Sequence, residues 1–324
     1  MRAPYGLGLR AIAIAATTVT TPGIANAQGE IRHVPRDYST IQSAVDSASA
    51  GDTIMVDAGV YSENVVVSRS NVRLVGAGKN VILDGDSLIG IGIYVKGASA
   101  AVPVTGVEVS NFEVRNFERG IIAQFAANAS VMHNYVHDNA DKIGPTLLGD
   151  GTGIELVTSS SSDVSHNVVI RNGIGGIQLR VGSTGNAIHH NDVNENGWQS
   201  PTLDGVGILD TGLGTNDNRV EYNVIDSNNG RGVLLSRPSG TVPITGNLVA
   251  HNQAHGNQRA GIAVMAAATA NIIVFNDARD NNLSGLPPCY QCNLVDLSDA
   301  GGNFWNKNLG TFNGTDPCMP AAIQ

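Results

Sequence analysis

The stretch VSHNVVIRNGIGGIQL, residues 164–179, contains two asparagines five residues apart, Asn167 and Asn172, followed by a glycine-led apolar run. The same pair recurs at Asn111/Asn116, Asn134/Asn139, Asn191/Asn196, Asn223/Asn228, Asn247/Asn252, Asn276/Asn281 and Asn303/Asn308. The first asparagines of successive pairs are 23, 33, 24, 32, 24, 29 and 27 residues apart. This period is typical of solenoid repeats.

Each repeat contains three short apolar segments: one ends at the first asparagine, one lies between the two, and one is the glycine-led run. Strands this short are stable only when stacked coils bury their inward side chains against the next coil. Backbone hydrogen bonds then join coils that lie about 4.8 Å apart. We expect the asparagines to occupy tight turns in a left-handed conformation and to bond from coil to coil. The pattern predicts an all-β, single-domain parallel β-helix with asparagine-marked coils over about 105–308.

The two ends of the solenoid carry different patterns. Residues 39–49 have apolar positions at helical spacing and Ser39 as a candidate N-cap, so we expect a short helix that covers the first coil. Short strands are expected at 53–57, 65–67, 72–75 and 81–83. Phe304, Trp305 and Pro317 are expected in a C-terminal cap over about 286–324.

The first 27 residues have the pattern of an export signal. Arg2 and Arg10 precede the apolar run AIAIAATTV, and PGIANA ends at Ala27 with small residues. This predicts a signal peptide over 1–27, a mature domain over 28–324, and a secreted or periplasmic protein.

Composition narrows the class of partner. The net charge of −9 argues against a nucleic-acid partner, because phosphate binding needs a Lys/Arg surface. No apolar run reaches about 18 residues, so no membrane-spanning helix is expected. The protein is expected to be a monomer. In an exported chain, a disulfide between Cys318 and either Cys289 or Cys292 is expected.

The run YSTIQSAVDSASAGDTIMVDAGVYSENV (38–65), followed by VRLVGAG (72–78) and VILDG (81–85), resembles the opening of secreted proteins of the pectin-lyase-like superfamily. With the coils, the resemblance covers nearly the whole mature chain. It implies a right-handed parallel β-helix. The superfamily includes pectate and alginate lyases, polygalacturonases, pectin methylesterases, uronan epimerases and non-enzymatic periplasmic accessory proteins. The catalytic motifs of these enzymes are not found in this sequence, so no family's catalytic residues can be carried over.

Three inserts precede glycine-led runs, at residues 140–151, 197–205 and 253–260. The first two share Pro-Thr-Leu and end in Asp-Gly, at Asp150 and Asp204. Loops that leave a rigid scaffold in register form the walls of a groove. Duplication of two coils explains the shared residues equally well.

The glycine-led runs would form the floor of this groove. Aligned as GIEL (153–156), GIQL (176–179), GILD (207–210), GVLL (232–235) and GIAV (261–264), they place alternate residues outward. The outward column is then Glu155, Gln178, Leu209, Leu234 and Ala263, with Arg180 two positions further and Arg237 alongside. Asp210 falls at an inward position, where a carboxylate is costly unless the strand bulges or the charge is used.

These positions predict a candidate catalytic set of Asp150, Glu155, Arg180, Asp204, Asp210 and Arg237. Asp150, Arg180 and Asp204 are expected to be exposed. An arginine could neutralise a uronate carboxylate, or the acidic side chains could hold calcium; no dedicated metal site is expected. A hydrolase would instead need two carboxylates about 5–9.5 Å apart. Gln178, Trp198 and His255 are candidates for substrate contact. A solvated polar strand face explains the same residues without chemistry.

A second column precedes the first asparagines, at His133, His166, His190 and Tyr222, with Phe275 further on. It could bind metal, but no acidic partner recurs beside it, so we favour a structural stack. His137, His251 and His255 are expected nearer the loops.

The sequence therefore predicts an exported carbohydrate-active protein that binds a polysaccharide, with uronate-containing chains among the candidates, along the glycine-led strands and acts as a lyase or hydrolase. The alternative is a non-catalytic glycan-binding, surface or periplasmic accessory protein. Clustered carboxylates favour the enzyme, because a binding protein needs aromatic platforms instead.

Overall fold

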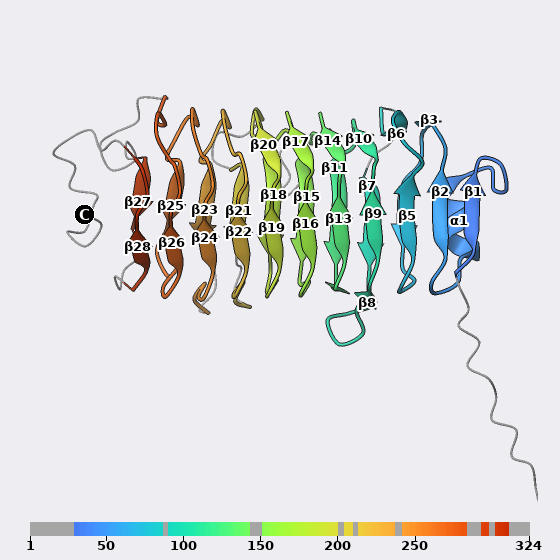
Figure 1. The fold of residues 1–324 in the computed structure, drawn as a ribbon, viewed down its shortest axis with the longest axis horizontal. Helices are drawn as coiled ribbons and strands as arrows, with labels where there is room; N and C mark the ends of the chain where they lie inside the picture. Colours follow the sequence, from blue (N-terminus) through green and yellow to red (C-terminus); the bar gives the residue numbers. More distant parts are fainter. Residues whose placement is uncertain are drawn as a thin grey trace, which may run out of the picture.

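A computed structural model of the protein describes residues 29–86, 90–142, 151–199, 204–209, 213–236, 242–283, 293–297 and 302–310. The chain winds as a parallel β-helix whose coils lie side by side along the long axis of the molecule (Figure 1). In these residues, successive coils add strands to three long parallel sheets, which we call sheets A, B and C in the order in which each coil visits them. The all-β solenoid predicted from the sequence is confirmed.

Sheet A has eleven described strands: β1 (Ile31–Val34), β2 (Thr53–Val56), β5 (Arg73–Gly76), β9 (Glu108–Ser110), β13 (Ser130–Met132), β16 (Asp163–Ser165), β19 (Ala187–His189), β22 (Arg219–Glu221), β24 (Leu248–Ala250), β26 (Ile272–Val274) and β28 (Phe304–Asn306). Sheet B has six: β3 (Gly59–Tyr61), β6 (Val81–Asp84), β10 (Glu113–Arg115), β14 (Tyr135–His137), β17 (Val168–Ile170) and β20 (Asp192–Asn194).

Sheet C, which contains the glycine-led runs, has nine described strands: β4 (Val65–Val67), β7 (Ile91–Lys96), β11 (Arg119–Gln124), β15 (Thr152–Val157), β18 (Gly175–Arg180), β21 (Val206–Leu209), β23 (Val233–Ser236), β25 (Ile262–Val264) and β27 (Leu294–Asp296). A small parallel pair, β8 (Val104–Thr105) and β12 (Ala126–Ala127), lies where the chain passes from sheet C to sheet A.

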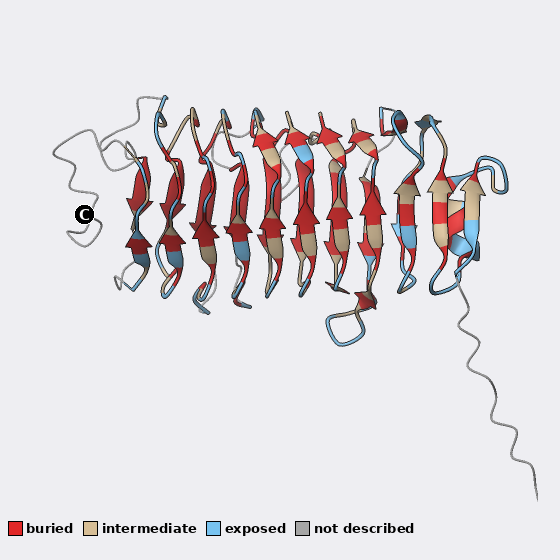
Figure 2. Ribbon diagram, in the orientation of Figure 1, coloured by how far each residue is buried: buried red, intermediate tan, exposed pale blue. Residues whose placement is uncertain are grey.

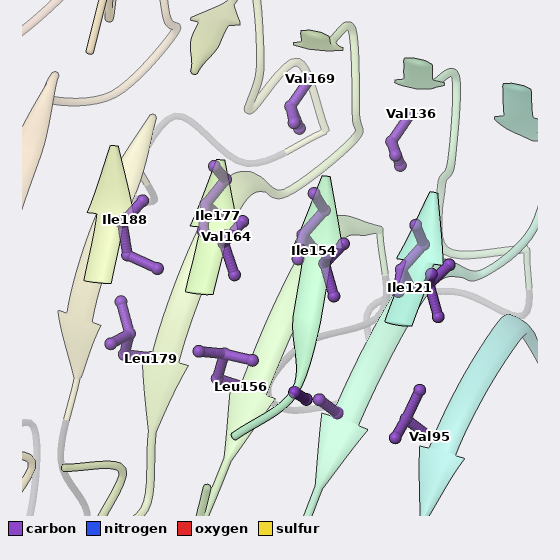
Figure 3. Packing of buried hydrophobic residues seen from close by; sticks show 14 of the residues in the cluster. Val95, Ile121, Val136, Ile154, Leu156, Val164, Val169, Ile177, Leu179 and Ile188 are labelled. Carbon is purple, nitrogen blue, oxygen red and sulfur yellow. The ribbon is translucent and has the colours of Figure 1, made fainter. Parts of the chain in front are cut away.

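The core is a set of columns that run along the axis. Ile121, Ile154 and Ile177 occupy the same position on adjacent strands of sheet C, and all three are fully buried (Figure 3). The sheet C strands of the middle coils, such as β15 and β18, are buried along most of their length (Figure 2). Each buried aliphatic side chain contributes roughly 1.5–3 kcal/mol of transfer free energy, so stacking supplies the stability that a single coil lacks.

Three buried asparagine ladders hold the corners. The A–B corner has Asn134, Asn167, Asn191, Asn223, Asn252, Asn276 and Asn308. The B–C corner has Asn139, Asn172, Asn196, Asn228, Asn257, Asn281 and Asn293. The C–A corner has Asn186, Asn218, Asn247, Asn271 and Asn303. Within a ladder, one side-chain oxygen accepts from the previous coil: Asn196 Oδ1 accepts from the backbone N–H and the side-chain amide of Asn172, both at 3.0 Å.

The sequence pattern predicted that all eight asparagine pairs are equivalent, and this was partly wrong. Asn247 and Asn303 belong to the C–A ladder, whereas Asn252 and Asn308 continue the A–B ladder. Asn111 and Asn116 are not ladder members at all, because Phe112 and Phe117 stand at those positions.

Where a described corner contains a left-handed residue next to the ladder, this is not the ladder asparagine but the residue before it. His166 (φ 56°) precedes Asn167, and Arg171 (φ 51°) precedes Asn172. The chain reverses at this preceding residue, which turns the asparagine amide inward toward the next coil.

The B–C ladder explains why the sheet C runs begin with glycine. A Cβ atom on Gly176 would lie 2.6 Å from the carbonyl oxygen of Gly205 and 3.0 Å from the Asn196 amide nitrogen. A Cβ on Gly205 would meet Asn228 in the same way, at 2.7 Å. Glycine is needed because the ladder amides and the next coil leave no room for a side chain.

The predicted capping helix is α1 (Ile41–Ser47), which lies at the N-terminal end of the stack (Figure 1). It buries Ile41, Ala44 and Val45 against the first coil. Its N-cap is Thr40 rather than Ser39, because the Thr40 hydroxyl accepts from the N–H of Ser43.

At the other end, Phe304 and Trp305 do not form a separate cap but lie in β28, a regular strand of sheet A. Trp305 takes the inward position that Ile273 holds on the previous coil, and its Nε1 donates to Asp296 Oδ2 at 2.8 Å. Pro317, the three cysteines and the predicted signal peptide lie outside the described residues. Within the described residues, no helix has the length and hydrophobicity needed to cross a membrane.

Candidate functional site

The outer face of sheet C carries the candidate site, in a register that differs from the prediction. Gln178 pairs with Gly207, and Arg180 pairs with Leu209. The inward position that the sequence alignment gave to Asp210 is taken by Ile208, which is fully buried. The alignment was wrong by two residues, because residues 205–208, not 207–210, form the glycine-led run of this coil. Asp210, Asp150 and Arg237 lie outside the described residues.

Glu155 is the centre of the site. Its Oε1 forms an ion pair with Arg180 Nη1 at 2.6 Å, and Arg119 Nη1 lies 3.9 Å from its Oε2. The side chains of Glu155 and Arg180 are only 2% and 11% exposed, so Arg180 is not the exposed residue that the sequence predicted. A charge this far from water is stable only when it is paired, and two arginines do this for one carboxylate.

A hollow of about 200 Å³ lies directly over this group, lined by residues of β7, β11, β15 and β18. Tyr94 and Gln124 border it, and the Tyr94 hydroxyl donates to the Gln124 side-chain oxygen. Burial raises the pKa of Tyr94, so this phenol stays protonated around neutral pH. The hollow therefore combines a carboxylate, two guanidinium groups and a phenolic proton.

Several buried polar atoms on this face have no hydrogen-bond partner: Thr152 Oγ1, Glu155 Oε2, Gln178 Nε2 and Asp204 Oδ2. They belong to three consecutive coils. Native proteins leave few such atoms, and a concentration of them marks a place where water or a ligand completes the bonding.

Asp204 is fully buried, contrary to the prediction that it is exposed. Arg231 lies beside it, with Nη1 at 3.5 Å from Oδ1 and its backbone N–H donating to the same oxygen. Desolvation nevertheless raises the pKa of Asp204 to about 6, because Arg231 offsets only part of the cost.

The first two predicted inserts do meet. The Gln199 side-chain amide accepts from the N–H of Asp141 at 2.9 Å and donates to its carbonyl oxygen at 3.0 Å. Trp198, next to this link, is 55% exposed, and its Nε1 donates to the carbonyl of Arg171 at 3.0 Å. Trp198 is therefore held by a hydrogen bond while more than half of the residue remains exposed.

The third predicted insert is an ordinary part of a coil. Gln253 bridges Val224 and Asp277 in continuation of sheet B, and Asn257 belongs to the B–C ladder. His255 follows on the sheet B side, where its Nε2 lies 3.0 Å from Asp277, so it is not a residue of the sheet C groove. Residues 253–260 were taken for an insert because the pair Asn247/Asn252 was aligned with pairs that lie one corner later in their coils.

The histidine column forms a stack at the A–B corner, and His251 belongs to it rather than to the loops. In the described residues, no group of three or more His, Cys, Asp or Glu side chains is arranged to hold a metal ion.

The sequence did not point to Arg119, Tyr94 or Arg231. Arg119 precedes Gly120 and Ile121, a glycine-led run that was not aligned with the others. Aligning it would have placed Arg119 one strand from Glu155. Tyr94 carried no such signal, because its coil has a less regular sequence.

A family model described as the right-handed beta helix region matches residues 60–215. The protein is a right-handed parallel β-helix. This is the fold of the pectin-lyase-like superfamily. No curated protein matches the sequence of this β-helix.

Solved structures share the fold at low sequence identity. The A-module of the mannuronan C-5 epimerase AlgE4 from Azotobacter vinelandii is 15% identical with a TM-score of 0.55, over 85% of this chain and 93% of that one. The pectate lyase Pel9A is 13% identical with a TM-score of 0.55, over 91% and 82% of the two chains. The Dettilon tailspike protein is 13% identical with a TM-score of 0.57, over 87% and 62%.

Proposed function

We propose that this protein binds a uronate-containing polysaccharide across the outer face of sheet C and cleaves it by β-elimination, as a lyase. The observation that carries the proposal is Glu155, held between Arg119 and Arg180 at the floor of a hollow. The names of the epimerase and the pectate lyase with this fold support a carbohydrate substrate. The leader pattern over 1–27 supports export of the protein.

The chemistry follows from the charges in the hollow. Two guanidinium groups flank one carboxylate, and a uronate carboxylate of the substrate can bind to either guanidinium. Neutralising that carboxylate makes the C5 proton more acidic, and Glu155 Oε2 has no hydrogen-bond partner that would compete for this proton. As the C5–H bond breaks, the C4–O bond to the next sugar breaks and a C4=C5 double bond forms. The departing oxygen takes a proton from the Tyr94 hydroxyl or from water.

A hydrolase mechanism has less support in the described residues. Glu155 is the one carboxylate among the residues that line the hollow. Asp204 lies two coils further along, roughly 10 Å on the axis, and three residues nearer the start of its strand, a further roughly 10 Å. This separation exceeds what paired carboxylates need, and Asp204 is already paired with Arg231.

Non-catalytic glycan binding is the second candidate, and Trp198 favours it. An exposed indole held by a hydrogen bond to the Arg171 carbonyl offers a ready platform for a sugar ring. The arginines supply the positive charge that calcium would otherwise provide, so neither candidate requires the metal.

The test is turnover of alginate, polygalacturonate and neutral xylan, with calcium or with EDTA, followed by the ultraviolet absorbance of the unsaturated product. Glu155→Gln keeps the size of the side chain but removes the proton acceptor, so we expect turnover to fall at least about 100-fold. Glu221→Gln is the matched control on sheet A, where the glutamate pairs with Arg219; it should keep full activity. Full activity of Glu155→Gln would refute the proposal. Binding without turnover by the wild type would leave the glycan-binding function in its place.

A further inference from the structure

Six exposed rings form a continuous stack at the A–B corner, which we call the ring column: His133, His166, His190, Tyr222, His251 and Phe275. Neighbouring ring centroids lie 4.8–5.3 Å apart. All pairs after the first are within 15° of parallel. Each ring sits on the left-handed residue before a ladder asparagine, so one ring projects from every coil.

The stack leaves few ring faces open. Each ring inside the ring column is covered on both sides by its neighbours, so only its edges reach solvent. At the far end, Lys307 Nζ lies 5.2 Å from the centre of Phe275 and covers its outer face. At the near end, the place before His133 is occupied by Asn111, which has no ring. In the described part of the ring column, His133 is therefore the one ring with a face that neither a ring nor a cation covers.

A hollow of about 540 Å³ lies beside this end, and His133 borders it. It exists because the corner after β5 is longer than the others. Two residues, His133 and Asn134, connect β13 to β14, whereas residues 77–80 connect β5 to β6. Gly78, within this longer turn, has φ +137° and nothing within 4 Å of the place where a Cβ would be, so the turn leaves open space.

The polar lining of the hollow is mixed. Lys79 borders it, is exposed, and forms no ion pair with any described residue. Glu113 borders it as well, and its contacts to Arg115 at 2.8 Å and His137 at 3.3 Å both use Oε1. Glu113 Oε2 is therefore available as an acceptor opposite a lysine donor.

We propose that this hollow binds one sugar residue of a glycan, with the sugar ring stacked on His133 and its hydroxyls bonded to Lys79 and Glu113. Sugar hydroxyls both donate and accept, which suits a lysine and a carboxylate that face one aromatic ring. A nucleobase would also stack, but the net charge of −9 opposes a nucleic-acid chain.

The ligand class rests on the proposed polysaccharide function, but the site is separate from it. The hollow is at the A–B corner, whereas Glu155 lies on sheet C. A second attachment point on another face would raise the avidity for a long chain without changing the turnover of a short one.

The experiment measures the affinity of the full chain for alginate, polygalacturonate and xylan in a Glu155→Gln background, so that bound glycan is not cleaved. His133→Ala and Lys79→Ala are each expected to weaken binding about tenfold, as for the loss of one stacking or charged contact. His251→Ala removes another exposed ring of the ring column, one that does not border the hollow, and this variant should bind as the parent does. With Glu155 intact, His251→Ala should cleave a uronate trisaccharide at the wild-type rate. Melting temperatures check that each variant folds.

Unchanged affinity of both His133→Ala and Lys79→Ala, or no glycan bound by the parent, would overturn the inference. So would a single-stranded DNA oligonucleotide that binds through His133 more tightly than any glycan. Loss of turnover in Glu155→Gln with unchanged affinity in His133→Ala would refute the second site alone. Weakened binding in His133→Ala with full turnover in Glu155→Gln would refute the lyase proposal alone.

Discussion

Glu155 lies in β15 of sheet C and Asp204 lies two residues before β21 of the same sheet, and burial affects the two carboxylates differently. Glu155 is held between two arginines, whereas Asp204 pairs with Arg231 across a longer distance of 3.5 Å and keeps a buried oxygen without a partner. The raised pKa of Asp204 means that its charged form is poorly stabilised in the folded protein.

This gives a pH dependence of stability. The folded pKa of about 6 lies above the ordinary aspartate pKa of 3.8, so the folded state holds this proton more tightly than the unfolded state. The contribution of Asp204 is therefore greatest below pH 4 and is lost as the pH rises from 4 to 6, by roughly 3 kcal/mol at most. Asp204→Asn cannot ionise and should lack this loss.

Chemical denaturation at pH 4, 5, 6 and 7 checks the prediction. The free energy of unfolding of Asp204→Asn, relative to the wild type, should shift in favour of the variant as the pH rises. Parallel pH profiles for the two proteins would show that Asp204 is not a buried carboxyl of raised pKa.

At the scale of the strand and corner, two glycines of one coil allow a matched test. A Cβ on Gly205 would lie 2.5 Å from Ile225 and 2.9 Å from the Gly232 carbonyl, whereas a Cβ on Gly207 would meet only the Leu209 side chain, at 3.2 Å. Gly205→Ala should therefore lower the free energy of unfolding by several kcal/mol, while Gly207→Ala should change it by less than about 1 kcal/mol. Equal stability of the two variants in urea denaturation would contradict the ladder geometry.

The asparagine ladder gives a second prediction at this scale. Asn172 is fully buried, accepts from Asn139, and donates to Val136 and Asn196. Asn172→Ala leaves these groups unpaired and should cost roughly 2–5 kcal/mol. Asn308→Ala, at the last described coil, removes fewer buried bonds and should cost less. Thermal melts compare the two, and turnover per folded molecule should be unchanged in both, because neither residue lies in the hollow over Glu155.

The sequence predicted the elements well and their phase poorly, for a physical reason. Asn247 and Asn252 are five residues apart across the short strand of sheet A, and Asn252 and Asn257 are five apart across sheet B. The same spacing therefore occurs twice in one coil, and spacing alone cannot distinguish the corners. The B–C corner differs from the A–B corner in the glycine that follows it and makes room for the ladder amides. Recognising that glycine requires the structure, which shows the carbonyl of the next coil that it approaches.

The site was predictable only in part, for the same reason. Gln178 aligns with Glu155 on the neighbouring strand, and Arg180 follows two residues later on the same side of that strand. The sequence could therefore predict that Glu155 and Arg180 share a face. The Arg119–Glu155 contact joins neighbouring coils, and the burial of Asp204 depends on what covers the sheet, so neither follows from a single repeat.

For the whole molecule, three parallel sheets run along one axis, and the two proposed glycan contacts lie at different places around it. The hollow over Glu155 lies on sheet C, and the hollow beside His133 lies at the A–B corner. A long polysaccharide would have to bend around the coil to occupy both, whereas a short oligosaccharide reaches one. This arrangement suits an enzyme that holds a polymer at one face and cleaves it at another.

The most direct test is a crystal structure of the Glu155→Gln variant with the uronate oligosaccharide that the wild type cleaves. We predict sugar density on sheet C, with a carboxylate bonded to Arg119 or Arg180 and the C5 atom within about 3.5 Å of the substituted side chain. Density on sheet A or sheet B, with the hollow over position 155 empty of sugar, would contradict the assignment of the active site.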